Sequence, residues 1–135
     1  MRKIRFLLFA LLALLYVTNA NALDVGDKIE SNGITYEVTS MGETGLTPTN
    51  YTEVKVVSST VTGALTIPDI ISDKLNQYKC KVTAIASAGT YTNVTSVTLP
   101  STLKTINTNA FSKSQITTIN IPQELMILKM VHLLR

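Results

Sequence analysis

Few side chains in the sequence could carry out acid–base, nucleophilic or metal chemistry. His132 is the only histidine and lies near the C-terminus, so the body of the chain cannot form a Ser/His/Asp or Cys/His set. Asp69 and Asp73 lie four positions apart and could form a carboxylate pair, but no base or ligand cluster accompanies them, and a solvated loop is the favoured interpretation. The sequence also has no zinc-ligand spacing, no glycine-rich phosphate loop and no EF-hand pattern. We therefore expect no enzyme activity, no metal and no cofactor.

The single cysteine, Cys80, cannot form an internal disulfide. It lies in an alternating segment in which Tyr78, Cys80 and Val82 share one face of a strand and two lysines share the other. We expect Cys80 to be a small buried hydrophobic residue, and a reactive thiol is the alternative.

Uncharged hydroxyl and amide side chains recur at outward positions of the predicted strands, and they form the candidate binding face for a protein or glycan. They are Thr66, Thr95, Ser96, Thr98, Thr117, Thr118 and Asn120. Stacked repeats build extended binding surfaces. Threonine also suits exposed strand positions on propensity alone, so a purely structural interpretation stays open.

These residues lie in a sequence repeat. Four positions recur at one constant offset: Val94, Val97, Leu99 and Pro100 return as Ile116, Ile119, Ile121 and Pro122. The offset falls within the period of about 20–29 residues that is typical of leucine-rich repeats, and it predicts a solenoid of that class. The predicted repeat core consists of Leu65, Ile67, Val82, Ile85, Val94, Val97, Leu99, Leu103, Ile106, Ala110, Phe111, Ile116, Ile119 and Ile121.

We place the repeats at residues 65–122. The interval from Pro68 to Pro100 is longer than that from Pro100 to Pro122, which indicates an insertion at 72–81 with an extra strand at 78–82. Residues 82–85 then match 103–106, Ala88 matches Ala110, and Gly89 stands at the place of Phe111. Phe111 would thus be the only aromatic plug among the repeats, and we expect the first unit to have a looser core.

Residues 23–64 precede the repeats and alternate apolar and polar side chains between turns. Asn32-Gly33 is a tight-turn signal, residues 34–38 and 53–57 are predicted strands, and 41–51 is a predicted loop. We interpret this segment as a β-hairpin cap on the first coil, because the terminal units of a solenoid must cover an apolar end.

Residues 1–22 have the pattern of a secretory signal peptide. Arg2, Lys3 and Arg5 precede an apolar run at 6–17, and Ala20-Asn21-Ala22 is a cleavage site. We expect cleavage before Leu23 and export to the cell surface or beyond, with an uncleaved anchor as the alternative. The whole chain has a formal charge of +3, and cleavage leaves nine Lys+Arg against nine Asp+Glu. The balanced charge argues against nucleic acid as a partner.

Residues 123–135 depart from the repeat pattern, because they lack Ala-Phe and are rich in Leu, Met and Ile. Reading the codons from Met126 two nucleotides later permits Asp-Ile-Glu-Asp-Gly-Ala-Phe, which restores the pattern. We hypothesise that a frameshift between Pro122 and Met126 truncated a longer repeat protein. Resequencing the gene tests this hypothesis, and an alternative frame without further repeats would refute it.

The repeats resemble the BspA-like leucine-rich repeats, with consensus L-x-x-[IV]-x-[IL]-P-x-x-[VL]-x-x-I-x-x-x-A-F. The resemblance is carried by Ile67-Pro68, Leu99-Pro100, Ile121-Pro122, Ile106 and Ala110-Phe111, and the segments 32–38 and 78–85 are also similar to those of such proteins. It covers residues 26–122 and departs from the family at Gly89, in the small number of units and in the tail.

The resemblance implies a mainly β leucine-rich-repeat solenoid with an N-terminal β-hairpin cap. It also implies a secreted or surface protein typical of Bacteroidetes, which binds a host or neighbouring-cell protein or glycan without catalysis. The alternative is a non-functional or purely structural fragment of a longer surface protein. The uncapped last repeat further predicts self-association.

Overall fold

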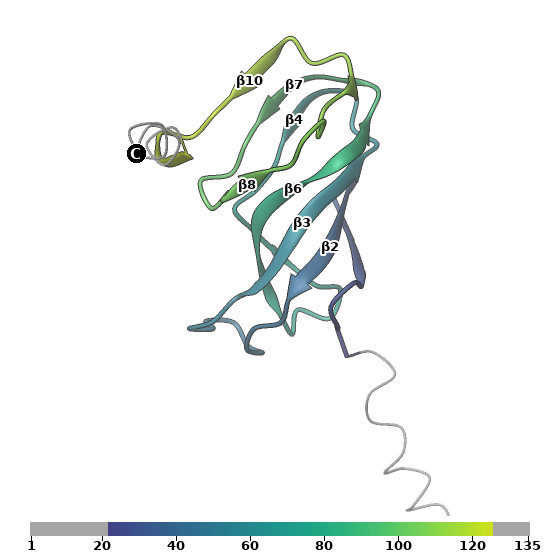
Figure 1. Ribbon diagram of the computed structural model, residues 1–135. Coiled ribbons are helices and arrows are strands. Elements are labelled where there is room, and N and C mark those ends of the chain that lie inside the picture. The colour runs from purple at the N-terminus through teal and green to yellow at the C-terminus, as the bar shows by residue number, and fades with distance from the viewer. Residues whose placement is uncertain (1–21, 126–135) are drawn as a thin grey trace, which may run out of the picture.

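The computed structural model describes residues 22–125, which form two β-sheets along one elongated body (Figure 1). The larger sheet has the order β1-β2-β3-β6-β5, and the short strands β8 and β9 lie beside β6. Its strands are β1 (Lys28–Ser31), β2 (Ile34–Ser40), β3 (Thr52–Ser59), β5 (Ile70–Ser72), β6 (Lys79–Tyr91), β8 (Thr105–Ile106) and β9 (Lys113–Ser114). The smaller sheet has the order β10-β7-β4 and consists of β4 (Gly63–Thr66), β7 (Val94–Thr98) and β10 (Thr118–Asn120). The predicted mainly β repeat architecture is confirmed.

The N-terminal hairpin forms where the sequence predicts it. Asn32 and Gly33 both have positive φ, 50° and 75°, and join β1 to β2 as a two-residue turn with Ser31 opposite Ile34. Positive φ at both central residues matches the twist of antiparallel strands, and Asn-Gly adopts it readily. The alternating residues Ile34, Tyr36 and Val38 of β2 are buried, as the period of a strand requires.

The hairpin joins the repeats through a parallel pair of strands. β3 runs parallel to β6, with Val54 opposite Val82 and Val56 opposite Ile85, and all four side chains are buried. β6 is one continuous strand of 13 residues, so the predicted extra strand at 78–82 and the start of the return half of the coil belong to a single strand. The capping hairpin and the first coil therefore share one sheet and one core.

The repeat register follows the predicted offsets. In the three-stranded sheet Leu65 lies opposite Val97, and Val97 lies opposite Ile119. On the return side, Ile85 lies opposite Ile106. All of these pairs are parallel, so each strand lies beside its counterpart in the next coil.

The predicted match of Ala88 to Ala110, and of Gly89 to Phe111, is wrong. The positive φ values fall at Ala88 and Asn109, 51° and 58°, so Gly89 takes the place of Ala110, and both of these are buried while Ala88 is exposed. The register then changes, because Thr90 pairs with Lys113. The second unit is therefore longer here than the first, and Phe111 falls in its extra length.

The first unit also has an aromatic plug, which overturns the expected loose core. Tyr91 is completely buried, and its ring lies 5.1 Å from that of Phe111 at 53°. Gly89 makes room for this ring: a Cβ there would collide with the Tyr91 ring and lie 2.8 Å from the Val57 carbonyl oxygen. The small residue at 89 and the aromatic residue at 91 thus act as one packing unit.

Most of the predicted repeat core is buried, with an exception at the last coil. Ile106, Phe111 and Ile116 are partly buried against the fully buried members. Ile119 and Ile121 are instead 41% and 46% exposed. The reason is their place in or next to β10, which has a neighbouring strand on one side among the described residues.

Candidate functional site

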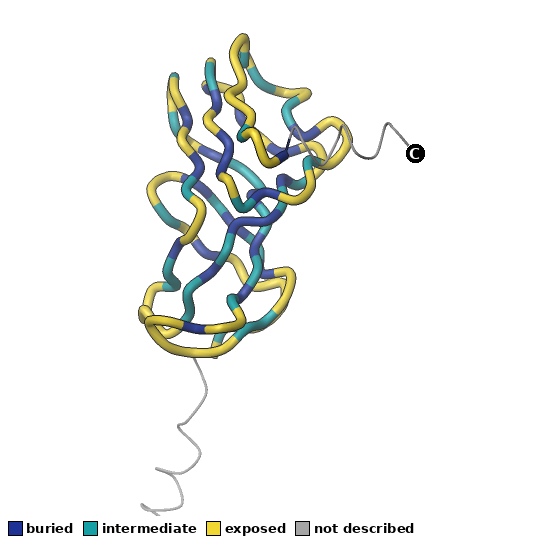
Figure 2. Tube along the Cα trace, turned by 90° about the vertical axis from the view of Figure 1, so that its left-hand side faces the viewer, coloured by how far each residue is buried: buried dark blue, intermediate teal, exposed yellow. Residues whose placement is uncertain are grey.

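The candidate binding face is the outer surface of the three-stranded sheet. The register places Thr66, Thr98 and Asn120 in one row, and Ala64, Ser96 and Thr118 in a second row. Ser96 is half-buried and the other five residues are exposed, whereas Leu65 and Val97 of the same strands are buried in the core. Figure 2 shows this change between buried and exposed positions along the strands of the molecule. The alternation of a strand thus sends the hydroxyl groups outward and the aliphatic groups inward.

Thr95 and Thr117 lie beside these rows, Thr95 in the middle strand β7 and Thr117 directly before β10. The Thr117 amide donates to the Thr95 carbonyl at 2.9 Å, and the Thr117 hydroxyl donates to the same oxygen at 3.4 Å. The structure therefore brings five of the seven predicted residues into the two rows and places Thr95 and Thr117, both exposed, next to each other beside them. The second row also contains Ala64, which was not among the predicted residues.

No charged residue lies within β4, β7 or β10. The face offers hydroxyl and amide groups, which both donate and accept hydrogen bonds and do not titrate near neutral pH. A partner would be held by hydrogen bonds and shape, with weak dependence on salt and pH.

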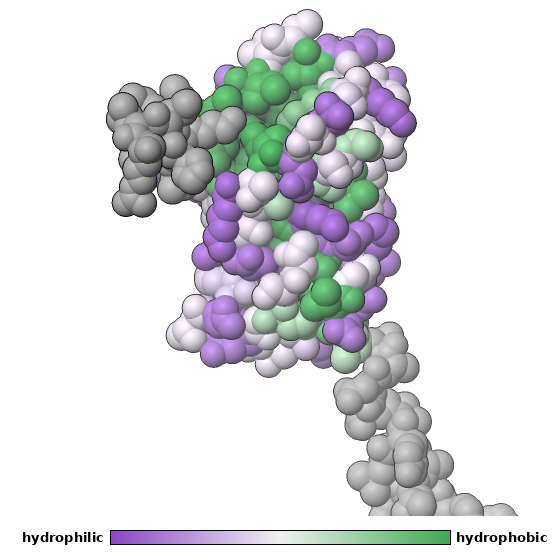
Figure 3. Space-filling view, in the orientation of Figure 1, coloured by the Kyte–Doolittle hydropathy of each residue, from purple (hydrophilic) through white to green (hydrophobic). Residues whose placement is uncertain are grey.

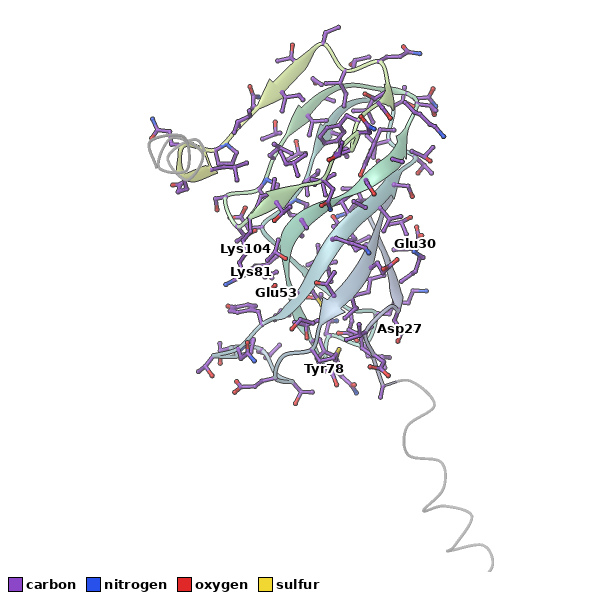
Figure 4. The ribbon with its side chains drawn as sticks, in the orientation of Figure 1. Asp27, Glu30, Glu53, Tyr78, Lys81 and Lys104 are labelled. Carbon is purple, nitrogen blue, oxygen red and sulfur yellow. The ribbon has the colours of Figure 1, made fainter. Side chains whose placement is uncertain are left out.

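The charged side chains gather instead on the outer face of the larger sheet. Glu37 accepts hydrogen bonds from Lys28 and Lys55 at 2.8 and 2.7 Å, and these two bonds, Lys28 first, lower the pKa of Glu37 to about 2. Glu53 pairs with Lys104 at 2.6 Å, and the neighbouring Lys81 ammonium lies 4.7 Å from the centre of the Tyr51 ring (Figure 4). Opposite charges are interleaved, as on an ordinary solvated sheet face.

Asp69 and Asp73 do not form a catalytic pair, because each is used by a different turn. Asp69 accepts the Ser101 amide at 2.7 Å and the Ser101 hydroxyl at 2.6 Å, and so holds the turn after Pro100. Asp73 accepts the amides of Leu75 and Tyr78 at 3.2 and 2.8 Å. Both carboxylates stabilise loops.

The prediction for Cys80 is confirmed. Its side chain is completely buried in the core, and burial raises the pKa of the thiol to about 11. The reactive thiolate is therefore disfavoured at neutral pH.

A shallow hollow lies at the opposite end of the molecule from β10. Its charged lining consists of Asp27, Lys28, Asp73 and Lys74, two groups of each sign. Within residues 22–125 no group of three or more His, Cys, Asp or Glu side chains is arranged to hold a metal ion. In the same part of the chain no helix has the length and apolarity to cross a bilayer.

Several predictions fall outside the described residues. The signal peptide, its cleavage site except for Ala22, and most of the tail with His132 belong to residues 1–21 and 126–135. Sequence reasoning also missed Tyr91. The signal for it was Gly89, whose lack of a side chain two positions before an aromatic ring marks a place where the ring can fold back.

No curated protein matches the chain. A solved structure titled "The Crystal structure of Pneumococcal vaccine antigen PcpA" is similar, with a TM-score of 0.57 and 24% sequence identity. The match covers 76% of this chain and 28% of that chain, so this chain spans little more than a quarter of its length. At this identity the likeness supports the fold.

The repeats themselves also match a known family. Residues 76–131 match the family model described as "BspA type Leucine rich repeat region (6 copies)". This segment includes β6 to β10, whose parallel register carries the repeat. Residues 76–131 of this chain are therefore a leucine-rich-repeat region of the BspA type.

Proposed function

We propose that this protein is a secreted or cell-surface repeat protein that binds a protein or glycan partner without catalysis. The contact surface is the outer face of β4, β7 and β10. The partner is a surface molecule of a host or a neighbouring cell. The similarity to a pneumococcal vaccine antigen supports a surface location.

One observation carries this proposal: the register that aligns Thr66, Thr98 and Asn120 across three parallel strands. Neighbouring strands of a sheet lie about 4.8 Å apart, so repeated polar groups on them form a regular array of donors and acceptors. A flat array of this kind fits an extended partner better than a small molecule, which needs a concave pocket.

Replacement of Thr98 by arginine tests the face at its centre. We expect the Thr98→Arg variant to bind cultured epithelial cells and arrayed glycans at least roughly tenfold more weakly than the parent, because a long charged side chain would hold the partner away from the middle strand. Fluorescently labelled protein and a titration on both surfaces give the comparison.

Thr105→Arg is the matched control. Thr105 is an exposed threonine on β8 in the larger sheet, so the variant has the same change of charge and size away from the proposed face. Equal weakening by both variants would contradict the proposed surface. Absence of binding by the parent to either probe would favour the alternative, a purely structural fragment of a longer surface protein.

Export is proposed from residues 1–22. We expect the secreted protein to begin at Leu23, after Ala20-Asn21-Ala22. Intact-mass analysis of protein recovered outside the cytoplasm measures this directly. A product that keeps Met1 and stays in the membrane fraction would reject cleavage.

A further inference from the structure

The open side of β10 is the most unusual surface of the described chain. β10 pairs with β7 on one side, and no strand within residues 22–125 pairs with its other side. In Figure 3 apolar side chains gather at this end of the molecule, beside a largely hydrophilic middle. Backbone groups on an open strand edge can pair with another strand.

The other two strands of the same sheet show what a second neighbour would do to β10. Val97, which has strands on both sides, is 1% exposed, whereas Ile119 at the same register position is 41% exposed. Leu99 is likewise 4% exposed, against 46% for Ile121 two strand positions beyond Ile119. One more strand beside β10 would bury two isoleucine side chains that are exposed in the described part of the chain.

The short strands β8 and β9 are protected in a way that β10 is not. Lys104 directly precedes β8, and β9 begins with Lys113. An exposed lysine at each of these short strands opposes pairing with a further strand. The segment from Thr117 to Ile121 contains no charged residue and no proline. Lysine at an edge is a common barrier to strand pairing, so β10 is better suited to pair with another strand than β8 or β9 is.

We propose that β10 pairs antiparallel with β10 of a second copy of this chain, around a two-fold axis at Ile119. In this arrangement Ile119 faces Ile119 of the second copy on the apolar side, and Thr118 faces Asn120 of the second copy on the polar side. No charge meets a like charge, and each cross-strand pair is favourable. The segment is therefore complementary to itself, and a two-fold dimer is the commonest closed assembly.

The pairing has a consequence for the proposed binding function, on which the dimer itself does not depend. Antiparallel pairing of two β10 strands joins two three-stranded sheets edge to edge. The hydroxyl face then continues from one copy to the next, and a repetitive partner could contact both copies at once.

The register gives a direct test by cross-linking of the full chain. In antiparallel pairs, residues directly opposite have Cα atoms about 4.5–5.5 Å apart, within the range that a disulfide spans. Ile119→Cys should therefore form a covalent dimer under mild oxidation, whereas Thr66→Cys on the far strand should not. The native Cys80 is buried and does not compete.

Analytical ultracentrifugation of the full chain and two further variants completes the test. We expect a reversible dimer in the parent, a dissociation constant raised by roughly tenfold or more in Ile119→Lys, and no change in Thr66→Lys. Ile119 is already 41% exposed, so the lysine variant should fold, and its thermal midpoint checks this.

Three results would overturn the proposal. A parent that stays monomeric into the submillimolar range excludes the dimer. Dissociation by Thr66→Lys indicates head-to-tail stacking of β10 on β4. Failure of Ile119→Cys to cross-link a dimeric protein excludes the two-fold register. None of these outcomes depends on whether cells or glycans bind the parent, so the dimer and the binding function are tested separately.

Discussion

Replacing Tyr91 with alanine is expected to lower the free energy of unfolding by about 3–5 kcal/mol, as for other large aromatic residues removed from a core. Tyr91 is completely buried at the end of β6, where its ring packs against Phe111 and over Gly89. The change leaves a cavity at the joint between the first and second coils. Since small domains have a total stability of about 5–15 kcal/mol, the variant should be close to unfolding at room temperature. Urea unfolding followed by circular dichroism measures the effect.

Two further variants distinguish the contribution of the Tyr91 ring to stability from those of its hydroxyl group and of Phe111. The Tyr91 hydroxyl is buried without a hydrogen-bond partner among the described residues, so Tyr91→Phe should be neutral or stabilising. Phe111 is partly buried, so Phe111→Ala should cost less than Tyr91→Ala. If Phe111→Ala lowered the free energy of unfolding more than Tyr91→Ala, Phe111 would be the main aromatic residue of the core, as the sequence predicts.

The repeat register could be predicted because it depends on local spacing. Val97, Leu99 and Pro100 recur at one constant offset as Ile119, Ile121 and Pro122, and parallel stacking of equal coils brings such positions together. The hairpin turn could be predicted for a similar reason, since Asn32-Gly33 favours a backbone conformation by itself.

Packing between coils could not be predicted in the same way. After the buried small residue, Gly89 in the first unit and Ala110 in the second, the second unit has extra residues before its next strand. An alignment that matches residue types places this extra length before the small residue instead of after it. Tyr91 was therefore missed as a core residue, although it fills the core of its own unit. Which side chain fills the core of a coil depends on the packing of neighbouring coils, and sequence spacing alone does not specify it.

The candidate face was accessible to sequence reasoning and its charged surroundings were not. An outward threonine is recognisable from the alternation around it, as at Thr98 between Val97 and Leu99. The ion pairs of Glu37 with Lys28 and Lys55 depend on how β1, β2 and β3 align. These strands precede the repeats, so the repeat spacing gives no information on their alignment. Cross-strand ion pairs become visible once the strands are placed.

Stability is expected to fall steeply in alkaline solution, by about 5 kcal/mol between about pH 9 and pH 12 from Tyr36 and Cys80 alone, because both are buried in their neutral forms. Burial raises the pKa of Tyr36 from 10.0 to about 12 and that of Cys80 from 9.0 to about 11. Burial, and then the nearby Tyr36, also raise the pKa of Tyr91. Below about pH 8 these groups are protonated in both states and add no pH dependence. Above it the unfolded chain loses its protons first, so rising pH favours unfolding.

Urea midpoints measured across this range, from neutral to strongly alkaline pH, test the expectation. Tyr36→Phe and Cys80→Ala should each make the alkaline decline shallower, since each removes one group that ionises more readily in the unfolded chain. Val54→Ala is the control: Val54 is equally buried beside them and does not titrate, so this variant should lower stability by a similar amount at every pH. A decline that keeps its slope in Tyr36→Phe would mean that the hydroxyl reaches water in the folded protein. The same pH series on Tyr91→Phe should give the shallowest decline of the single variants, because the Tyr91 pKa is raised by burial and by its neighbour together.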